Sequence, residues 1–316
     1  MTESASEPRS PKPSSSKPRL GYVGLGNMGA PMATRLLDWP GGLVVCDARP
    51  EALEPFTTAG AGAASTPAEV AARASIISVT VLDDAQVREV VDGPHGILTT
   101  ARPGTVVAIH STISDTTAVE LARICEVRGV LLIDAPISGG AGGAAQGRLA
   151  VMIGGSEEAF EAVSEPFGCW AELVVRAGDV GAGTRMKLAR NLLHFVSFTA
   201  TTEAARLAEA AGLNLRTLGK VVRHTDAITG GAGAIMLRDT TAPVSEDDPW
   251  FSILQHVRNL GEKDLALAID LGDRLNLELP LAHLALSGLG VGLGVDHGDG
   301  NGDGEPSPAS TTREHA

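Results

Sequence analysis

Three glycines near the start of the chain, Gly24, Gly26 and Gly29, have the spacing of a turn that binds a pyrophosphate. They follow a short apolar run and precede a helical pattern, so they would connect a strand directly to a helix. In such a turn the first glycine permits the tight bend, the second lets the backbone approach the ligand, and the third lets helix and strand pack closely. Unpaired N–H groups at the start of the helix would bind the phosphate charge. The spacing predicts a dinucleotide site, and a glycine-rich turn without a ligand is the alternative.

A carboxylate, Asp47, ends the next apolar segment about 20 residues after this turn, where such sites recognise the ribose. It could accept hydrogen bonds from both ribose hydroxyls of NAD, and its charge would repel the 2′-phosphate of NADP. Arg49 lies two residues further on and could accommodate that phosphate in part. We therefore expect NAD as the cofactor, with NADP as the alternative.

A basic side chain, Lys187, lies in a long helical pattern four residues before Asn191, so both side chains would share one face of the helix. In a cleft between domains, burial lowers the pKa of a lysine, and the amine can exchange a proton with a substrate hydroxyl or carbonyl. Asn191 could hold the lysine or the substrate oxygen without adding charge. On spacing alone, a solvated lysine beside Arg185 and Arg190 is the alternative.

A third polar segment, Ser138-Gly139-Gly140, follows an apolar run that ends at Asp134. Its glycines would expose backbone N–H groups, which together with the serine hydroxyl could bind a carboxylate. Further glycines follow, so a flexible turn is the alternative.

The composition excludes several classes of partner. The chain has 316 residues, 43% of them hydrophobic and 20% charged, and its formal net charge is −13. Nucleic-acid binding depends on clustered Lys and Arg, so this acidic balance argues against it. No apolar run is long enough to span a membrane, and none of the eight histidines has a partner at the spacing of metal ligands. The sparse cysteines, Cys46, Cys125 and Cys169, predict reduced thiols in the cytoplasm.

Strand and helix patterns alternate through the first half of the chain. Continuous β-branched runs bounded by Gly, Pro and Asp are typical of strands buried on both faces. Their alternation with helices predicts an α/β, Rossmann-like domain with a doubly wound parallel sheet, over residues 19–181. Besides the strand before Gly24, the predicted strands are 42–47, 74–80, 105–109, 130–134 and 149–155, and the predicted helices are 50–59, 84–91, 115–127 and 156–167.

Only helical patterns follow Val180. The stretch 182–211 contains no proline and predicts one long helix, with further helices predicted at 215–224, 251–275 and 280–289. We expect an all-α domain over 182–295 for substrate binding and dimerisation. Its apolar helix faces would suit a homodimer or homotetramer, although a core buried within one chain fits them equally. Residues 1–18 and 296–316 are polar, and we expect them to be disordered tails.

Four segments in this order along the chain resemble one known family, the β-hydroxyacid dehydrogenases or 3-hydroxyisobutyrate dehydrogenase family, which is related to 6-phosphogluconate dehydrogenase. The segments are 24–29, 134–140, 181–191 and 263–265. Together they extend over nearly all of the chain between the two tails. The resemblance implies a Rossmann-like domain followed by an all-α domain, in an NAD(P)-dependent enzyme.

The resemblance also implies roles for individual residues. Lys187 would be the catalytic acid and base with Asn191 beside it. The substrate's carboxylate would bind to Ser138, Gly139 and Gly140. The implied cofactor contacts are Gly24, Leu25, Gly26, Asn27, Met28, Gly29, Asp47, Leu82, Thr112 and Lys263.

Two positions depart from the family's pattern. Asp83 stands where relatives commonly have proline, so only a backbone role of Leu82 is implied. His110 stands where relatives usually have aspartate, and a structural residue at a strand end is a better interpretation of it than a catalyst.

The implied reaction transfers a hydride between a short 3-hydroxy carboxylate and NAD, while Lys187 exchanges the hydroxyl proton. Reduction of glyoxylate or a semialdehyde is one alternative, and a dinucleotide-binding scaffold without activity is another. Imine reductases share the architecture, but they typically replace this lysine, so Lys187 argues against them. The expected partner is a small hydroxy acid or aldehyde, and we expect neither a nucleic acid nor a membrane.

Overall fold

The computed structural model describes residues 17–236, 238 and 240–295. The chain forms two compact units that divide between Asn191 and Leu192. We call the first the sheet unit and the second the helical unit, and each is described by itself. The tails predicted at 1–18 and 296–316 lie outside the described residues, apart from Lys17 and Pro18.

The sheet unit is built on a nine-stranded sheet with the order β3-β2-β1-β4-β5-β6-β8-β7, and β9 pairs with β8. The strands β1 to β6 pair in parallel, β8 is antiparallel to β6 and β7, and β9 is parallel to β8. This arrangement confirms the predicted doubly wound parallel sheet over β1 to β6, and the antiparallel pairing of β8 was not predicted. The strands are β1 Leu20–Val23, β2 Leu43–Cys46, β3 Gly62–Ala63, β4 Ile76–Val79, β5 Val106–Ile109, β6 Leu131–Asp134, β7 Ile137–Ser138, β8 Leu149–Gly154 and β9 Ala171–Gly178.

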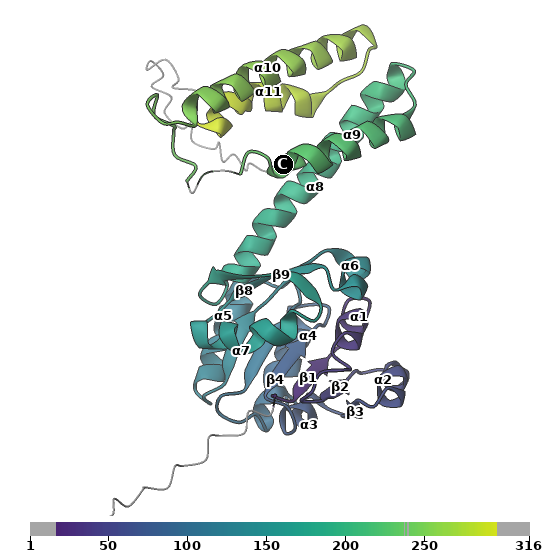
Figure 1. Cartoon of the computed structure of the whole chain (residues 1–316), viewed down its shortest axis with the longest axis vertical. Coiled ribbons are helices and arrows are strands. Elements are labelled where there is room, and N and C mark those ends of the chain that lie inside the picture. Colours follow the sequence, from purple (N-terminus) through teal and green to yellow (C-terminus); the bar gives the residue numbers. More distant parts are fainter. Residues whose placement is uncertain (1–16, 237, 239, 296–316) are drawn as a thin grey trace, which may run out of the picture. The chain divides into compact units, whose positions relative to one another are not determined.

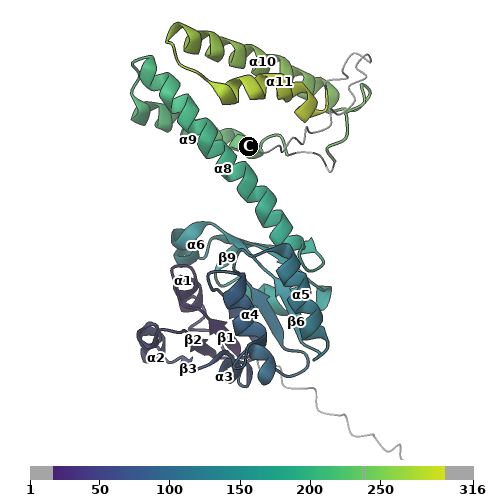
Figure 2. The ribbon, with the colours of Figure 1, turned by 180° about the vertical axis from the view of Figure 1, so that it is seen from behind.

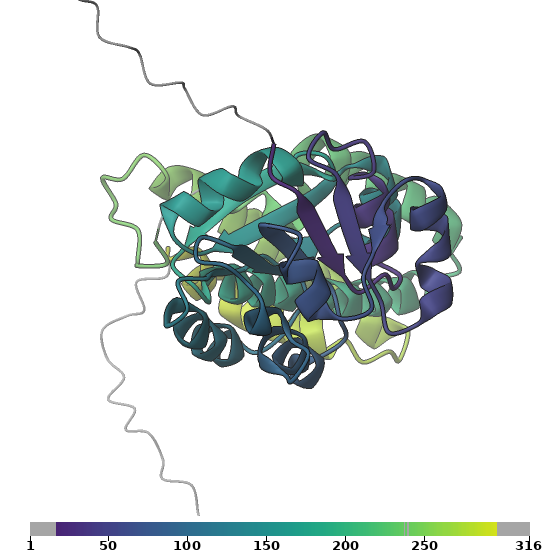
Figure 3. The ribbon, with the colours of Figure 1, turned by 90° about the horizontal axis from the view of Figure 1, so that it is seen from below.

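Helices cover both faces of this sheet. Helix α7 lies in front of it in Figure 1, and α4 and α5 lie in front in the reverse view of Figure 2. Figure 3 shows helices on either side of the strands. The helices of the first face are α1 Gly29–Thr34, α6 Gly140–Gln146 and α7 Glu157–Phe167, and those of the second are α3 Pro67–Ala71, α4 Asp84–Asp92 and α5 Asp115–Glu126. The short elements η1 Pro50–Ala52, α2 Glu54–Thr58 and η2 Ile97–Thr99 complete the described part of this unit.

The strands of the parallel sheet are apolar on both sides because each face has its own core. Successive side chains of a strand point to opposite faces. In β2, Leu43 and Val45 therefore belong to the cluster under α1 and α7, whereas Val44 and Cys46 belong to the cluster under α3, α4 and α5. The same alternation in the other central strands explains why their sequences are continuous apolar runs.

The structure corrects some of the predicted elements. The single helix predicted at 50–59 is interrupted, and α2 begins again around Pro55, whose missing N–H is tolerated only in a first turn. The segment 140–146 forms α6 despite three glycines, and β7 and β9 are strands that the sequence pattern did not predict. Tertiary pairing with β8 stabilises both strands.

The described part of the helical unit contains helices alone, which confirms the predicted all-α region. Helix α8 extends over Ala182–Ala210 and so crosses the division between the units. The remaining elements are α9 Leu215–Thr229, η3 Gly231–Gly233, α10 Phe251–Arg274 and α11 Pro280–Leu293. Helices α10 and α11 pack along each other (Figure 1). Within the described ranges, no helix is both long and apolar enough to cross a membrane.

Candidate active site

The predicted cofactor contacts of the sheet unit follow four neighbouring parallel strands. The glycine turn 24–29 follows β1, Asp47 follows β2, Leu82 follows β4 and Thr112 follows β5. Because these strands are parallel, their carboxyl ends meet at one edge of the sheet. The chain order reverses between β1 and β4, which is the place where open α/β sheets bind ligands.

The three glycines of the turn differ in what surrounds them. A Cβ on Gly24, whose φ is +94°, would lie 2.2 Å from Thr80 O, and one on Gly29 would lie 1.9 Å from Gly24 O. These distances confirm the tight bend and the close helix–strand packing predicted for both. A Cβ on Gly26 would meet no atom within 4 Å. The fold therefore leaves open space at the glycine that was predicted to face the ligand.

The rest of the turn is held to Asp47. The Leu25 N–H donates to Asp47 Oδ2 at 2.6 Å, and Arg49 donates to Asp47 Oδ1 from its N–H at 2.9 Å and from Nε at 3.1 Å. Burial raises the pKa of this carboxyl, but the hydrogen bonds from Leu25 and Arg49 outweigh burial and leave the pKa below its ordinary value. Asp47 is therefore ionised, and its oxygens keep lone pairs for further donors. Asn27 is exposed and Met28 half-buried.

Lys187 lies in the first turns of α8, and its amine contacts the strand β7. Its side chain is 8% exposed, and Nζ donates to Ile137 O at 2.6 Å and to Ser138 Oγ at 3.4 Å. Burial, and secondarily the positive charge of Arg190, lowers the pKa of this amine below its ordinary value. The amine can thus lose a proton more readily than a solvated lysine. Asn191 is half-buried, and its Oδ1 accepts a hydrogen bond from Arg190 Nη1 at 3.3 Å.

The segment beside Lys187 has a backbone that favours glycine. Gly139 has φ +130° and Gly140 has φ +68°, and both are exposed. A Cβ on Gly139 would also lie 2.9 Å from the Leu149 side chain. The structure thus brings Ser138 and Lys187 together, next to two exposed glycines.

The loops that carry Leu82 and Thr112 are joined by two further side chains, Ser111 and Asp84. Ser111 Oγ accepts from the Val81 N–H at 3.0 Å and donates to Val81 O at 2.7 Å. Three residues further along both loops, Asp84 Oδ1 accepts from the Ser114 N–H at 3.1 Å. Leu82 and Thr112 are both exposed beside these connections. The only signal in the sequence is that polar residues follow two adjacent strands.

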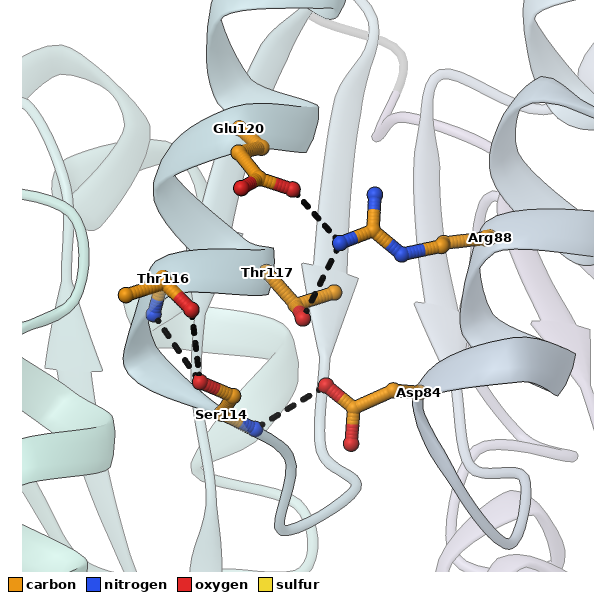
Figure 4. Close-up of polar contacts among 6 residues, drawn as sticks. All are labelled: Asp84, Arg88, Ser114, Thr116, Thr117 and Glu120. Carbon is orange, nitrogen blue, oxygen red and sulfur yellow. Dashed lines mark hydrogen bonds and ion pairs between the residues drawn. The ribbon is translucent and has the colours of Figure 1, made fainter.

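Helices α4 and α5 add a second set of contacts behind these loops (Figure 4). Arg88 of α4 donates to Thr117 Oγ1 at 3.2 Å and to Glu120 at 2.5 Å on α5. Ser114 caps the start of α5 through the Thr116 N–H. These contacts keep the two loops aligned.

His110 is buried and has a structural environment. Its Nδ1 lies 2.8 Å from Ala135 O, its Nε2 lies 3.0 Å from Ser78 Oγ, and its ring packs edge-on against Phe167 and Trp170. Burial lowers the pKa of His110 to about 4, so the ring is neutral near pH 7. These surroundings fit the structural interpretation of this residue.

Lys263 belongs to α10 of the helical unit, where it is exposed and forms an ion pair with Asp264 at 3.1 Å. Its assignment to the cofactor stays a prediction. Among the described residues, no group of three or more His, Cys, Asp or Glu side chains could hold a metal ion.

Two family models match consecutive parts of the chain. The NAD binding domain of 6-phosphogluconate dehydrogenase matches residues 19–178, and the NAD-binding domain of NADP-dependent 3-hydroxyisobutyrate dehydrogenase matches residues 181–299. An uncharacterised oxidoreductase of Mycobacterium tuberculosis is 61% identical over 86% of this chain and 92% of its own length.

Two solved structures are also similar. A protein of Mycobacterium avium described as an oxidoreductase is 57% identical, with a TM-score of 0.84 over 89% of this chain and 100% of that chain. The 3-hydroxyisobutyrate dehydrogenase of M. tuberculosis, solved with L-serine, is 30% identical, with a TM-score of 0.61 over 86% of this chain and 92% of that chain.

Proposed function

This chain belongs to the β-hydroxyacid dehydrogenase family, and from that premise we propose that it oxidises a short 3-hydroxy carboxylate with NAD, using Lys187 as the general base. The family makes it an oxidoreductase with a nicotinamide dinucleotide as cofactor. The observation that carries the proposal is the buried Lys187 amine, held 2.6 Å from Ile137 O and 3.4 Å from Ser138 Oγ.

Residues of the sheet unit fit the cofactor. The open backbone at Gly26 would face the pyrophosphate, Asp47 would accept the ribose hydroxyls, and the loops with Leu82 and Thr112 would contact the remainder. A nicotinamide cofactor held there would supply the acceptor for the hydride that leaves the carbinol carbon of the substrate. The carboxylate of Asp47 would disfavour a 2′-phosphate, although Arg49 is exposed and could turn toward one. The balance of charge favours NAD.

Lys187 would handle the proton of the same reaction. With its pKa lowered, a fraction of the amine is neutral and can take the proton of the substrate hydroxyl as the carbonyl forms. In the reverse direction the ammonium returns a proton to the carbonyl oxygen. Asn191 would hold the substrate oxygen without adding charge.

The substrate class follows from the neighbours of this amine. Ser138, Gly139 and Gly140 would bind a carboxylate through the hydroxyl and N–H groups, and the short distance from Ser138 Oγ to Lys187 Nζ suits a substrate with few carbons between its carboxylate and hydroxyl. The M. tuberculosis relative was solved with L-serine, which is itself a 3-hydroxy carboxylate. Reduction of a semialdehyde or glyoxylate would use the same groups in reverse.

The test is Lys187→Ala, with Lys220→Ala, an exposed lysine of α9, as the matched control. We expect kcat to fall about 10³-fold, because a positioned acid or base contributes 10²–10⁴-fold, while NAD binding measured by fluorescence is retained. A panel of 3-hydroxyisobutyrate, serine, glycerate, 3-hydroxypropionate and the matching aldehydes, with NAD(H) and NADP(H), identifies the substrate. Near-wild-type turnover of Lys187→Ala on its best substrate would refute the mechanism.

We also infer a homodimer or homotetramer in the cytoplasm, with the domain bounds 19–181 and 182–295. Support for association comes from apolar side chains of α8 that are exposed in the single chain: Leu192 is 68% exposed, Phe195 59% and Phe198 54%. Contiguous exposed apolar surface of this kind marks protein interfaces. Support for a reducing compartment comes from the three free thiols. Light scattering of the purified chain tests the oligomeric state, and a monomer at micromolar concentration would contradict it.

A further inference from the structure

A carboxylate that the proposed reaction does not use, Asp134, is completely buried at the end of β6. Its Oδ1 accepts the Gly181 N–H at 2.6 Å and its Oδ2 accepts the Thr184 N–H at 2.6 Å. Both of these hydrogen bonds thus come from backbone N–H groups that precede or begin α8. Burying a carboxyl group is costly unless its oxygens are hydrogen-bonded, so these two N–H donors stabilise Asp134 at this place.

The partners of Asp134 are the N–H of Gly181, directly before α8, and the N–H of Thr184 in its first turn. The first N–H groups of a helix have no partner within the helix, and a side chain of the preceding residue usually accepts one of them. Here the preceding residue is Gly181, which has φ +91° and no side chain. Asp134 supplies the missing cap from 47 and 50 residues away in the sequence, and its charge suits the positive end of the helix.

The cap lies one helical turn before Lys187. Thr184, whose N–H is held, precedes Lys187 by three residues, so the two lie on the same side of α8. The first turn is also pressed against the sheet, because a Cβ on Gly183 would lie 2.3 Å from Met152 O. The close packing of Gly183 on Met152 and the hydrogen bonds to Asp134 therefore restrict rotation and translation of the start of α8.

The segment 134–138 contacts α8 at one end through Asp134 and the Lys187 amine at the other. Ile137 and Ser138, which contact Lys187 Nζ, follow Asp134 by three and four residues. We propose that Asp134 is a positioning residue, whose two hydrogen bonds fix the start of α8 so that the Lys187 amine stays in register with Ser138. This inference rests on the proposed function, and it adds a residue that touches neither substrate nor cofactor.

Asp134→Asn tests the proposal, because the amide has the same size but accepts only one of the two N–H groups. A displacement of about 1 Å at a catalytic group can cost 10²-fold. We therefore expect kcat to fall about 100-fold while the Kd for NAD stays within about twofold. A double-mutant cycle with Lys187→Ala distinguishes this role from a merely structural one, because it compares the effect of Asp134→Asn on kcat with and without the amine. Asparagine at 134 should lower kcat no further once the amine is gone, since it acts only through that amine.

Glu203→Gln is the matched control. This carboxylate in the helical unit is 8% exposed and caps α11 in the same way, accepting the Leu281 N–H at 3.1 Å and the Ala282 N–H at 2.9 Å. We expect Glu203→Gln to lower the Tm as Asp134→Asn does, and to keep kcat within about threefold, since Glu203 follows Lys187 by 16 residues along α8. Asp134→Glu is the second variant, because it keeps the charge and both acceptors but displaces the helix, and it should lose kcat as well.

Four results would overturn the proposal. The first is a folded Asp134→Asn variant with normal kcat, and the second is a fall in kcat on Asp134→Asn that is equal with and without the Lys187 amine. The third is a normal kcat for Asp134→Glu, and the fourth is failure of both Asp134 variants to fold. The last would make Asp134 a residue of the fold alone. The proposed function fails separately: if Lys187→Ala itself keeps its turnover, the general base is wrong whatever Asp134 does.

Discussion

The two units of this chain bury their apolar residues in different ways. In the sheet unit, two extensive clusters occupy the two faces of the sheet, and the central strands β1, β2, β4 and β5 are buried throughout. Among the described residues of the helical unit, the buried cluster is small and consists of Val244, Leu254, Leu293 and Val295. Long helices there carry large apolar side chains that remain exposed, such as Leu284 at 68%.

The difference shows that an apolar segment can be buried within one chain or can remain available for association with another. A strand that is apolar on both sides can be satisfied within one chain, because helices before and after it cover both faces. A helix with apolar residues on several sides needs more neighbours than the described residues of the helical unit supply. The sheet unit therefore has the core of an independent domain, whereas the helical unit fits the proposed association with further copies.

The glycine turn offers the largest effect within the sheet unit. Gly29→Ala places a methyl group 1.9 Å from Gly24 O and should cost about 5 kcal/mol or more, at the limit of single substitutions. Gly26→Ala meets no atom within 4 Å and should leave the Tm nearly unchanged while weakening NAD binding at least about tenfold. Thermal unfolding and fluorescence titration measure the two effects. Equal losses of Tm would mean that the turn serves the fold alone.

A matched pair of leucines compares the two units directly. Leu121 in α5 is 1% exposed, and Leu121→Ala should lower the free energy of unfolding by about 3 kcal/mol. Leu284 in α11 is 68% exposed, and Leu284→Ala should change it by less than about 0.5 kcal/mol in the separated chain. Urea unfolding at low protein concentration gives both values. A large cost at Leu284 would show that this side chain is buried, and the contrast between the units would disappear.

Acid should destabilise the sheet unit through His110. Its pKa falls from an ordinary 6.5 to about 4 in the fold, so between these pH values the unfolded chain binds more protons than the folded one. Stability from this group is complete above about pH 6.5 and is lost as the pH falls toward 4, by up to about 3 kcal/mol. Urea unfolding across this range measures the slope. His110→Gln should flatten it, and an unchanged slope would place the titrating group elsewhere.

The smallest expected effect concerns cofactor choice. Asp47→Asn keeps an acceptor for the Leu25 N–H but removes the charge, and it releases Arg49 from its ion pair. We expect the preference for NAD over NADP, as a ratio of kcat/KM, to fall about tenfold, which corresponds to about 1.4 kcal/mol. The Tm should change little. A preference that stays constant would show that Asp47 does not face the ribose.

Local patterns in the sequence predicted much of the sheet unit and little of what fixes its site. The apolar runs predicted five of the six strands β1 to β6 closely and missed β3, because burial on both faces leaves a continuous apolar signal. The glycine turn was predicted with its steric roles because its geometry depends on residues that lie within six positions of one another in the sequence. The pair β7 and β9 was missed because each strand depends on β8 rather than on its own propensity.

The residues that hold the site's backbone in place, such as Asp134 and Ser111, were not predicted from the sequence because their partners lie far away along the chain. Asp134 caps a helix that begins about 50 residues later, and Ser111 binds a backbone 30 residues earlier. Such contacts leave no periodicity, because the partner of each side chain is a main-chain group that any residue could supply. The interruption at Pro55 was predictable, since proline after a short turn marks a new first turn.

The placement of the thiols has a practical consequence. Cys46, Cys125 and Cys169 are the chain's three cysteines, and all lie in the sheet unit. Burial raises the pKa of Cys46 to about 11 and that of Cys125 to about 12, so neither presents the reactive thiolate while the sheet is closed. The rate at which a disulfide reagent labels these two positions should therefore measure local opening of the sheet unit, and the wild-type chain needs no added cysteine for that measurement.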